Sequence, residues 1–147
     1  MKITICGSIA FYEQMLEIKQ KLELLGHEVD LPPSEVEDDQ GKMISVAEYY
    51  SRRKAGQESD TWIWDRKEWA MRLHFKKIEW ADAVLVLNYD KNDIANYIGG
   101  NTFLEIGIAF YLGKKIYLFN DIPEISYKEE ILGMKPVVIF EDLSKII

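Results

Sequence analysis

The sequence predicts an α/β fold, a parallel sheet with helices on both faces. Short apolar runs recur along the 147 residues, and segments with helical spacing separate them. Residues 81–120 give the clearest example, because a buried-type strand, a glycine loop, a helix and a second strand follow one another as in a right-handed βαβ unit. The length, without repeats or low-complexity sequence, fits one domain over residues 1–147.

The beginning of the chain predicts a first βαβ unit. Its parts are a strand (Lys2 to Cys6), the turn Gly7-Ser8-Ile9, a helix (Tyr12 to Leu25, with Gly26 as C-cap) and a second strand (His27 to Leu31). A Gly-Ser turn at a helix start places free backbone amides over the sheet edge, which suits an anion or a ribose. Alone, such a turn is a weak signal, because many only close a βα loop.

The middle of the chain is the least regular part. The acidic run at Glu35, Glu37, Asp38 and Asp39 is typical of a solvated loop, and Val46 to Lys54 fits a short helix. Because Ser34 to Asp60 is an insertion between a strand and the next helix, we expect it to lie over the sheet edge as a candidate lid.

A long amphipathic helix is predicted from Thr61 to Trp80, with Asp60 or Thr61 as its cap. Four tryptophans fall between positions 62 and 80, which is more than a core needs. Packing, including packing at a dimer interface, is the favoured use of these rings, and base stacking is the alternative.

The remaining elements complete a five-stranded sheet. They are strands at Ala83 to Leu87, Ile116 to Phe119 and Pro136 to Phe140, and helices opening at Gly99-Gly100 (capped by Asn101 or Thr102) and spanning Tyr127 to Leu132. This order predicts a flavodoxin-like doubly wound sheet with strand order 2-1-3-4-5. Ligand space is then expected at the switch point between the first and third strands. Gly7-Ser8, Asn88 and the loop from Gly99 to Glu105 should converge there.

Glu105 has two interpretations. It is a capping glutamate that bonds the backbone at the helix start, or it is a catalytic carboxylate at the sheet edge where ligands bind. Spacing alone favours the capping role, and the expected convergence of polar segments at the switch point favours the catalytic one.

Composition excludes several classes of function. A net charge of −7 and a pI near 4.9 argue against nucleic-acid and anionic-membrane surfaces. Cys6 is the only cysteine, which excludes an internal disulfide and fits a small core residue in a reducing compartment. No apolar stretch is long enough to cross a bilayer, and Met1-Lys2 leads straight into a strand, so a cytoplasmic protein is expected.

No cofactor or metal is expected from the motifs. The two histidines, one cysteine and scattered carboxylates have no metal-ligand spacing. The sequence contains neither a Walker lysine motif nor GxGxxG.

Three stretches resemble a known family. They are CGSI at Cys6 to Ile9, ADAVLVLN at Ala81 to Asn88, and NTFLEIGIAFYLGKKIYL at Asn101 to Leu118. They look like the nucleoside 2-deoxyribosyltransferase superfamily, which includes the 2'-deoxynucleoside 5'-monophosphate N-glycosidases. The likeness covers most of the chain in order and is weakest from Pro32 to Asp60. Its most specific piece is the glutamate followed by Ile-Gly-x-Ala and by Gly-Lys before a strand.

The resemblance implies a homodimer or larger homo-oligomer that cleaves the N-glycosidic bond of a (deoxy)nucleoside or its 5'-monophosphate, by hydrolysis or transfer. Glu105 is then the nucleophile that attacks the anomeric carbon, with a helix N-terminus expected to hold it ionised. The expected substrate contacts are Gly7, Ser8, Ile9, Asn88, Gly99, Gly100 and Asn101.

Three positions depart from the family pattern. Thr4 stands where a tyrosine commonly supports the nucleophile, His74 where an aspartate partners the base or the sugar, and Gly99 where Asp or Ser is common. His74 is either the acid that protonates the leaving base or a histidine packed against the tryptophans. The departures motivate an alternative, a nucleotide-binding or sensor module without catalysis. A third hypothesis is a domain that binds a partner through the tryptophan-rich helix.

Overall fold

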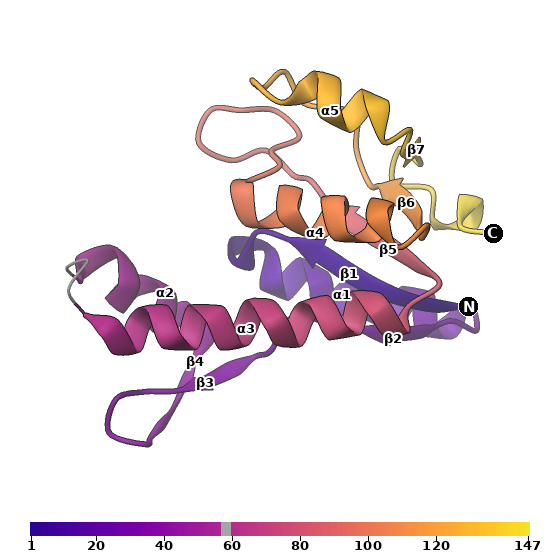
Figure 1. Ribbon diagram of the computed structural model, residues 1–147. Coiled ribbons are helices and arrows are strands. Elements are labelled where there is room, and N and C mark those ends of the chain that lie inside the picture. The colour runs from indigo at the N-terminus through magenta and orange to yellow at the C-terminus, as the bar shows by residue number, and fades with distance from the viewer. Residues whose placement is uncertain (57–59) are drawn as a thin grey trace.

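Five parallel strands form the central sheet of the computed structural model, which describes residues 1–56 and 60–147 (Figure 1). The strands are β1 (Lys2–Gly7), β2 (Glu28–Asp30), β5 (Ala83–Leu87), β6 (Lys115–Leu118) and β7 (Val137–Val138). Their spatial order is β2-β1-β5-β6-β7. Counted along the chain, this is the predicted order 2-1-3-4-5, so the flavodoxin-like fold class is confirmed.

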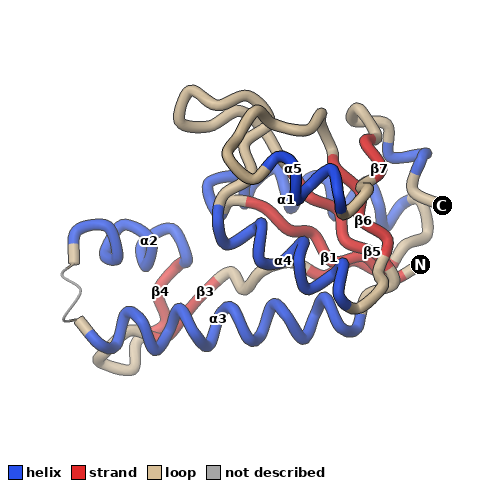
Figure 2. The backbone as a smooth tube through the Cα atoms, turned by 45° about the horizontal axis from the view of Figure 1, so that its top comes forward, coloured by secondary structure: helices blue, strands red, loops and turns tan. Residues whose placement is uncertain are grey.

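Helices cover both faces of the sheet. The helix α1 (Tyr12–Leu24) packs on one face, and α3 (Thr61–Trp80), α4 (Gly100–Tyr111) and α5 (Lys128–Gly133) pack on the other (Figure 2). The alternation of side chains along the strands explains both cores, because Ile3 and Ile5 face α1 while Val84 and Val86 face α4. None of the helices in the described residues has the length and apolar character that crossing a membrane requires.

The switch point lies between β1 and β5. The chain leaves β1 toward β2 on one side and later returns to β5 on the other side. In the parallel register, Cys6 pairs with Val86 and Gly7 with Leu87, so the carboxyl ends of both strands lie level. The loops that follow the two strands therefore share one edge of the sheet.

The expectation of a solvated loop in the acidic run is wrong. Residues 35–45 form an antiparallel hairpin of β3 (Glu35–Glu37) and β4 (Met43–Ser45), followed by α2 (Val46–Ala55). Val36, between Glu35 and Glu37, and Ile44 are both buried and pack with Tyr49 and Ile63, which fastens the insertion to α3. The predicted short helix is confirmed, and residues 57–59 of the expected lid lie outside the described residues.

The predicted cap of α4 is also wrong. The helix begins at Gly100 with Gly99 as its N-cap residue, earlier than the expected Asn101 or Thr102. The Asn101 side chain instead donates to Glu105, and Thr102 is buried. Because the helix starts earlier, Glu105 lies in its second turn, too far inside to close a capping box at the third position.

The last strand is shorter than predicted. Pairing with β6 is limited to Val137 and Val138, rather than extending from Pro136 to Phe140. Phe140 and Glu141 have positive φ angles of 50° and 64°, a backbone conformation that cannot continue a strand.

Candidate active site

A cavity of about 300 Å³ opens at the switch point, at the low end of the size range of small-molecule sites. Eight of the nine predicted site residues line it: Gly7, Ser8, Ile9, His74, Gly99, Gly100, Asn101 and Glu105. They come from the ends of β1 and α4 and from the middle of α3. The switch-point argument therefore located the cavity.

Asn88 is the predicted residue that does not line the cavity. Its side chain is fully buried, accepts a hydrogen bond from the Asn120 amide at 2.8 Å and donates to the Asp121 carbonyl at 2.8 Å. These bonds join the loop after β5 to the loop after β6. Asn88 therefore holds the edge of the sheet together and faces away from the ligand space.

Gly7 is required by the close approach of β1 to β5. A Cβ atom at this position would lie 2.9 Å from the Leu87 carbonyl oxygen and 3.1 Å from Met15 Cε. Both contacts are shorter than van der Waals distances, and one of them is to backbone that cannot move aside. The turn after β1 thus reaches the cavity because residue 7 has no side chain.

Glu105 lies on the floor of the cavity and is 3% exposed. Its Oε1 accepts a hydrogen bond from Asn101 Nδ2 at 2.7 Å, and its Oε2 has no partner among the described residues. Burial raises the pKa of Glu105 to about 8, against the smaller lowering effects of Cys6, Lys67 and Asn101. Burial thus disfavours the ionised form that the helix N-terminus was expected to favour.

His74 is buried beside Glu105, and its Nε2 lies 3.8 Å from Glu105 Oε1. Burial, followed by the charge of Lys77, lowers the pKa of His74 to about 4, although Asp30 and the Ile5 backbone oppose this shift. Its Nδ1 makes no hydrogen bond of ordinary geometry among the described residues. The ring is therefore neutral at pH 7, which argues against the expected role of a cationic acid.

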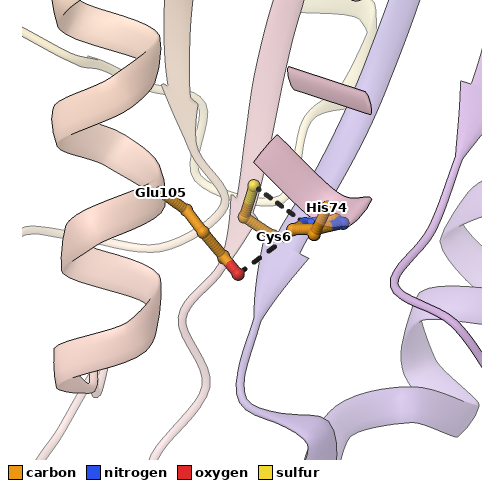
Figure 3. A group of neighbouring side chains, drawn as sticks. All are labelled: Cys6, His74 and Glu105. Carbon is orange, nitrogen blue, oxygen red and sulfur yellow. Dashed lines mark hydrogen bonds and ion pairs between the residues drawn. The ribbon is translucent and has the colours of Figure 1, made fainter. Parts of the chain in front are cut away.

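Sequence reasoning missed Cys6, a fully buried residue that contacts His74 and does not itself line the cavity. Its Sγ lies 3.6 Å from His74 Nε2, and the dashed lines in Figure 3 join His74 to both Cys6 and Glu105. Burial, with Glu105 as the second cause, raises the pKa of the Cys6 thiol well above its usual range. We call Cys6, His74 and Glu105 the floor cluster.

Thr4 supports α3 rather than Glu105. It is on the same face of β1 as Cys6, one pleat earlier, and its Oγ1 donates to the Lys77 carbonyl at 2.8 Å. Cys6, two residues farther along this face, contacts His74. The Thr4 hydroxyl is thus engaged with α3, and Cys6 is the β1 residue that joins His74 and Glu105.

The glycine at position 99 also has a structural explanation. A Cβ atom at this position would lie 2.9 Å from the Tyr97 hydroxyl and 3.1 Å from Cε1 of the same ring. Tyr97 itself lines the cavity. A tyrosine two residues earlier thus fills the space into which an Asp or Ser at position 99 would point.

The outer wall of the cavity is cationic and aromatic. We define it as Tyr50 and Arg53 of α2 together with Lys91 of the loop after β5. Lys91 Nζ donates to Ser8 Oγ at 2.7 Å and lies 5.7 Å from the centroid of the Tyr50 ring, while the Arg53 guanidinium lies 4.8 Å from the same ring. Hydrogen bonding by Lys54, with further contributions from nearby cations, lowers the pKa of Tyr50.

The expected lid thus forms a wall. Its helix α2 is fixed to α3 by the Tyr49 hydroxyl, which donates to the Ile63 carbonyl at 2.7 Å. Tyrosines, rather than tryptophans, are the aromatic rings among the described lining residues. Trp64, Trp69 and Trp80 are between 39% and 45% exposed, so base stacking inside the cavity is not their use.

Comparison with known proteins gives matches in structure only. No family model and no curated protein matches the chain. A 2-deoxyribosyltransferase from the psychrotolerant bacterium Bacillus psychrosaccharolyticus aligns with 80% of this chain and 71% of its own length, at 19% identity and a TM-score of 0.50. The CMP N-glycosidase BcmB of Clostridium botulinum aligns with 94% of this chain and 85% of its own, at 16% identity and a TM-score of 0.48.

The first of these structures is named as a 2-deoxyribosyltransferase, the kind of protein that the sequence resembles. At identities below 20% the likeness describes the arrangement of the backbone, and the roles of individual residues have to be argued from the site itself. The chain is thus similar in fold to a 2-deoxyribosyltransferase.

Proposed function

We propose that this protein cleaves the N-glycosidic bond of a nucleoside 5'-monophosphate, with Glu105 as the nucleophile. One observation carries the proposal. The cavity holds a buried carboxylate on its floor and cations on its outer wall, and Glu105 is the only carboxylate among its described lining residues. A nucleotide has the matching polarity, because its anomeric carbon becomes positive during cleavage while its phosphate is negative.

The reaction follows from this placement. Ionised Glu105 forms a bond to the anomeric carbon as the carbon–nitrogen bond breaks, and the base leaves with the bonding electron pair and takes up a proton. Water then hydrolyses the glycosyl ester and restores the carboxylate. If a second base reaches the intermediate before water does, the glycosyl group is transferred instead.

The outer wall supports the phosphate assignment. Lys91 and Arg53 line the cavity of a protein whose net charge is −7, so they locally reverse its overall sign. Lys91 already donates to Ser8, and the turn at Gly7-Ser8 adds backbone amides on the same side. A 5'-phosphate at this place leaves the sugar between the wall and Glu105.

In this proposal His74 positions Glu105. As a neutral ring between Cys6 and the carboxylate, it restricts where Oε1 can lie. The ionised form of Glu105 is favoured by Asn101 and by the charge of Lys67, which also lines the cavity. Binding of the substrate in this arrangement selects the ionised fraction of Glu105.

The test is incubation with matched pairs of nucleosides and nucleoside 5'-monophosphates, with the free base measured by chromatography. Native protein should release base from at least one monophosphate, and Glu105→Gln, which keeps the side-chain shape, should release none. Glu17→Gln is the control, because Glu17 is exposed on α1, on the opposite face of the sheet. Base release by Glu105→Gln at the native rate would contradict the proposal.

A second candidate is a nucleotide-binding module without turnover. The raised pKa of Glu105 favours it, because a carboxyl with a pKa of about 8 is mostly protonated at pH 7, and neutral His74 offers no cationic acid. This candidate predicts that one nucleotide raises the melting temperature while no base is released. The same incubation, with a thermal melt alongside, separates the two functions.

We also infer a homodimer in a reducing compartment such as the cytoplasm. Exposed Trp64 and Trp69 on α3 are aromatic residues of the kind enriched at interfaces, and the single cysteine is a buried thiol. Sedimentation of the native protein and of Trp69→Ala tests the association. An unchanged monomer in both would contradict the dimer.

A further inference from the structure

Three side chains with different metal-binding donors meet beside the cavity, which two of them, His74 and Glu105, line. Cys6 comes from β1, His74 from α3 and Glu105 from α4 (Figure 3). One donor atom from each residue lies within 4.8 Å of the other two, and all three residues are buried. The sequence analysis found no ligand spacing because the three positions are far apart along the chain.

Two of the three donor–donor distances are close to those of a tetrahedral zinc site, and the third is within 4.8 Å. Cys6 Sγ and His74 Nε2 are 3.6 Å apart, and His74 Nε2 and Glu105 Oε1 are 3.8 Å apart. Bond lengths of about 2.3 Å to sulfur and about 2.0 to 2.1 Å to nitrogen and oxygen place tetrahedral ligands about 3.3 to 3.6 Å from one another. Only small side-chain adjustments separate the present positions from that geometry.

We propose that the floor cluster of Cys6, His74 and Glu105 binds a zinc ion. A thiolate, an imidazole and a carboxylate are the ligand types that zinc accepts together, whereas magnesium and calcium require oxygen ligands. Three protein ligands leave a fourth position, and both His74 and Glu105 line the cavity from which a water molecule can reach it. With the two anionic ligands, the buried zinc centre has no net charge, which limits the cost of burial.

A second observation points to a missing ligand. Glu105 Oε2 is buried without a hydrogen-bond partner among the described residues, which is costly for a carboxyl oxygen. Asn101 uses one of the two lone pairs of Oε1, so Oε1, which lies 3.8 Å from His74 Nε2, and Oε2, unpartnered among the described residues, both keep a lone pair for a ligand. Coordination by a cation would satisfy the carboxyl group as a whole.

Zinc binding goes beyond the proposed function and opposes it. A metal on Glu105 removes the electron pair that attacks the anomeric carbon, so the ion acts as an inhibitor of any chemistry at this carboxylate. The site itself depends only on the three donors. It can therefore be tested without a substrate, and failure of either proposal leaves the other standing.

Cobalt(II) is the spectroscopic probe for this site. Addition of cobalt chloride to the reduced protein should produce thiolate-to-cobalt charge-transfer absorption and the visible bands of a tetrahedral ion, saturating at one equivalent. Cys6 is the only cysteine, so a thiolate band can come from no other residue of the chain. Zinc should abolish these bands at one equivalent and raise the melting temperature of the protein.

Matched variants separate the site from accidental binding. The chain has two histidines, and His27 lies 3.4 Å from the terminal amine, where an adventitious site can form. His27→Gln should keep the full thiolate band, whereas His74→Gln and Glu105→Gln should weaken cobalt binding at least about tenfold. Cys6→Ser should lose the band, and circular dichroism reports whether each variant is folded.

Two results would overturn the proposal. One is the absence of a thiolate band in folded native protein with excess cobalt. The other is a band that remains at native affinity in both His74→Gln and Glu105→Gln, since this would mean that the thiol binds alone. If Cys6→Ser fails to fold, the folded His74→Gln and Glu105→Gln proteins decide the question.

Discussion

The cavity floor and the outer wall differ in how their ionisable side chains are surrounded. The floor cluster comes from three core elements, and burial shifts all three pKa values toward the neutral forms. On the wall, Arg53 and Lys91 lie over tyrosine rings in contact with water. The comparison teaches that floor charges are governed by desolvation and wall charges by the surrounding salt, so the two can be perturbed separately.

The largest expected effect concerns the floor. The pKa of Glu105 is about 8 in the folded protein against an ordinary 4.5, so the unfolded chain releases this proton first as pH rises. Stability should therefore fall between about pH 4.5 and pH 8, by up to about 5 kcal/mol in total. Glu105→Gln removes this dependence, because its amide does not ionise. Urea unfolding of both proteins at pH 5 and pH 8 measures the difference.

The comparison between native protein and Glu105→Gln isolates Glu105 from its neighbours. His74, whose pKa is lowered to about 4, contributes stability that rises with pH up to about 6.5, but it is present in both proteins. Lys67 and Asn101 are also shared, and Cys6 titrates only at high pH. If the stability curves of native protein and Glu105→Gln run parallel from pH 5 to pH 8, burial does not raise the pKa of Glu105.

The second effect concerns the strand beneath the floor. Gly7→Ala should destabilise the protein by about 2 kcal/mol, because its Cβ would lie 2.9 Å from the Leu87 carbonyl oxygen. Gly107→Ala on α4 is the control, since no atom lies within 4 Å of the added Cβ and alanine favours a helix by up to about 1 kcal/mol. Thermal melts of the two variants measure the difference. Equal melting temperatures for Gly7→Ala and Gly107→Ala would contradict the close approach of residue 7 to the Leu87 carbonyl.

The third effect concerns the wall. Lys91→Met should weaken binding of a nucleoside 5'-monophosphate by about tenfold or more, because a charge-assisted hydrogen bond to the phosphate is lost. Binding of the matching nucleoside should change little, and so should the free energy of unfolding. Lys54→Met is the control, because Lys54 contacts Tyr50 without lining the cavity. Calorimetry showing an equal loss for nucleoside and monophosphate would place the phosphate elsewhere.

The smallest effect concerns the attachment of the wall. Tyr49→Phe deletes the hydroxyl that donates to the Ile63 carbonyl at 2.7 Å, which should cost about 1 kcal/mol of stability. Tyr111→Phe, at a residue that is 85% exposed, should cost nothing measurable. Denaturant midpoints compare the two. A null result for Tyr49→Phe would mean that apolar packing alone holds α2 in place.

The sheet was predictable because its signals are local. The run from Ala83 to Leu87 is apolar at every position, and all five residues are buried in β5. The strand order then followed from the succession of elements, and it placed Gly7, Ser8 and Glu105 at one edge. The hairpin at residues 35–45 escaped prediction because each strand has three residues and buries a single side chain, Val36 between two glutamates and Ile44 between Met43 and Ser45.

The chemistry of the floor was predictable in part. Glu105 and His74 were found through helix spacing and family resemblance, but Cys6 resembled any small core residue. Its contact with the other two depends on the packing of β1 against α3 and α4, which no local pattern encodes. Lys91 was missed for a related reason, because it lies in a loop whose side chains have no periodicity to indicate which way they point.

The two outermost strands of the sheet have a consequence for assembly. The strand β2 is three residues long and carries Glu28 and Asp30, and β7 has two residues. Such short borders offer few free amides and carbonyls for a further strand, and acidic side chains repel a like neighbour. Copies of this chain are thereby disfavoured from pairing edge to edge into continuous sheets.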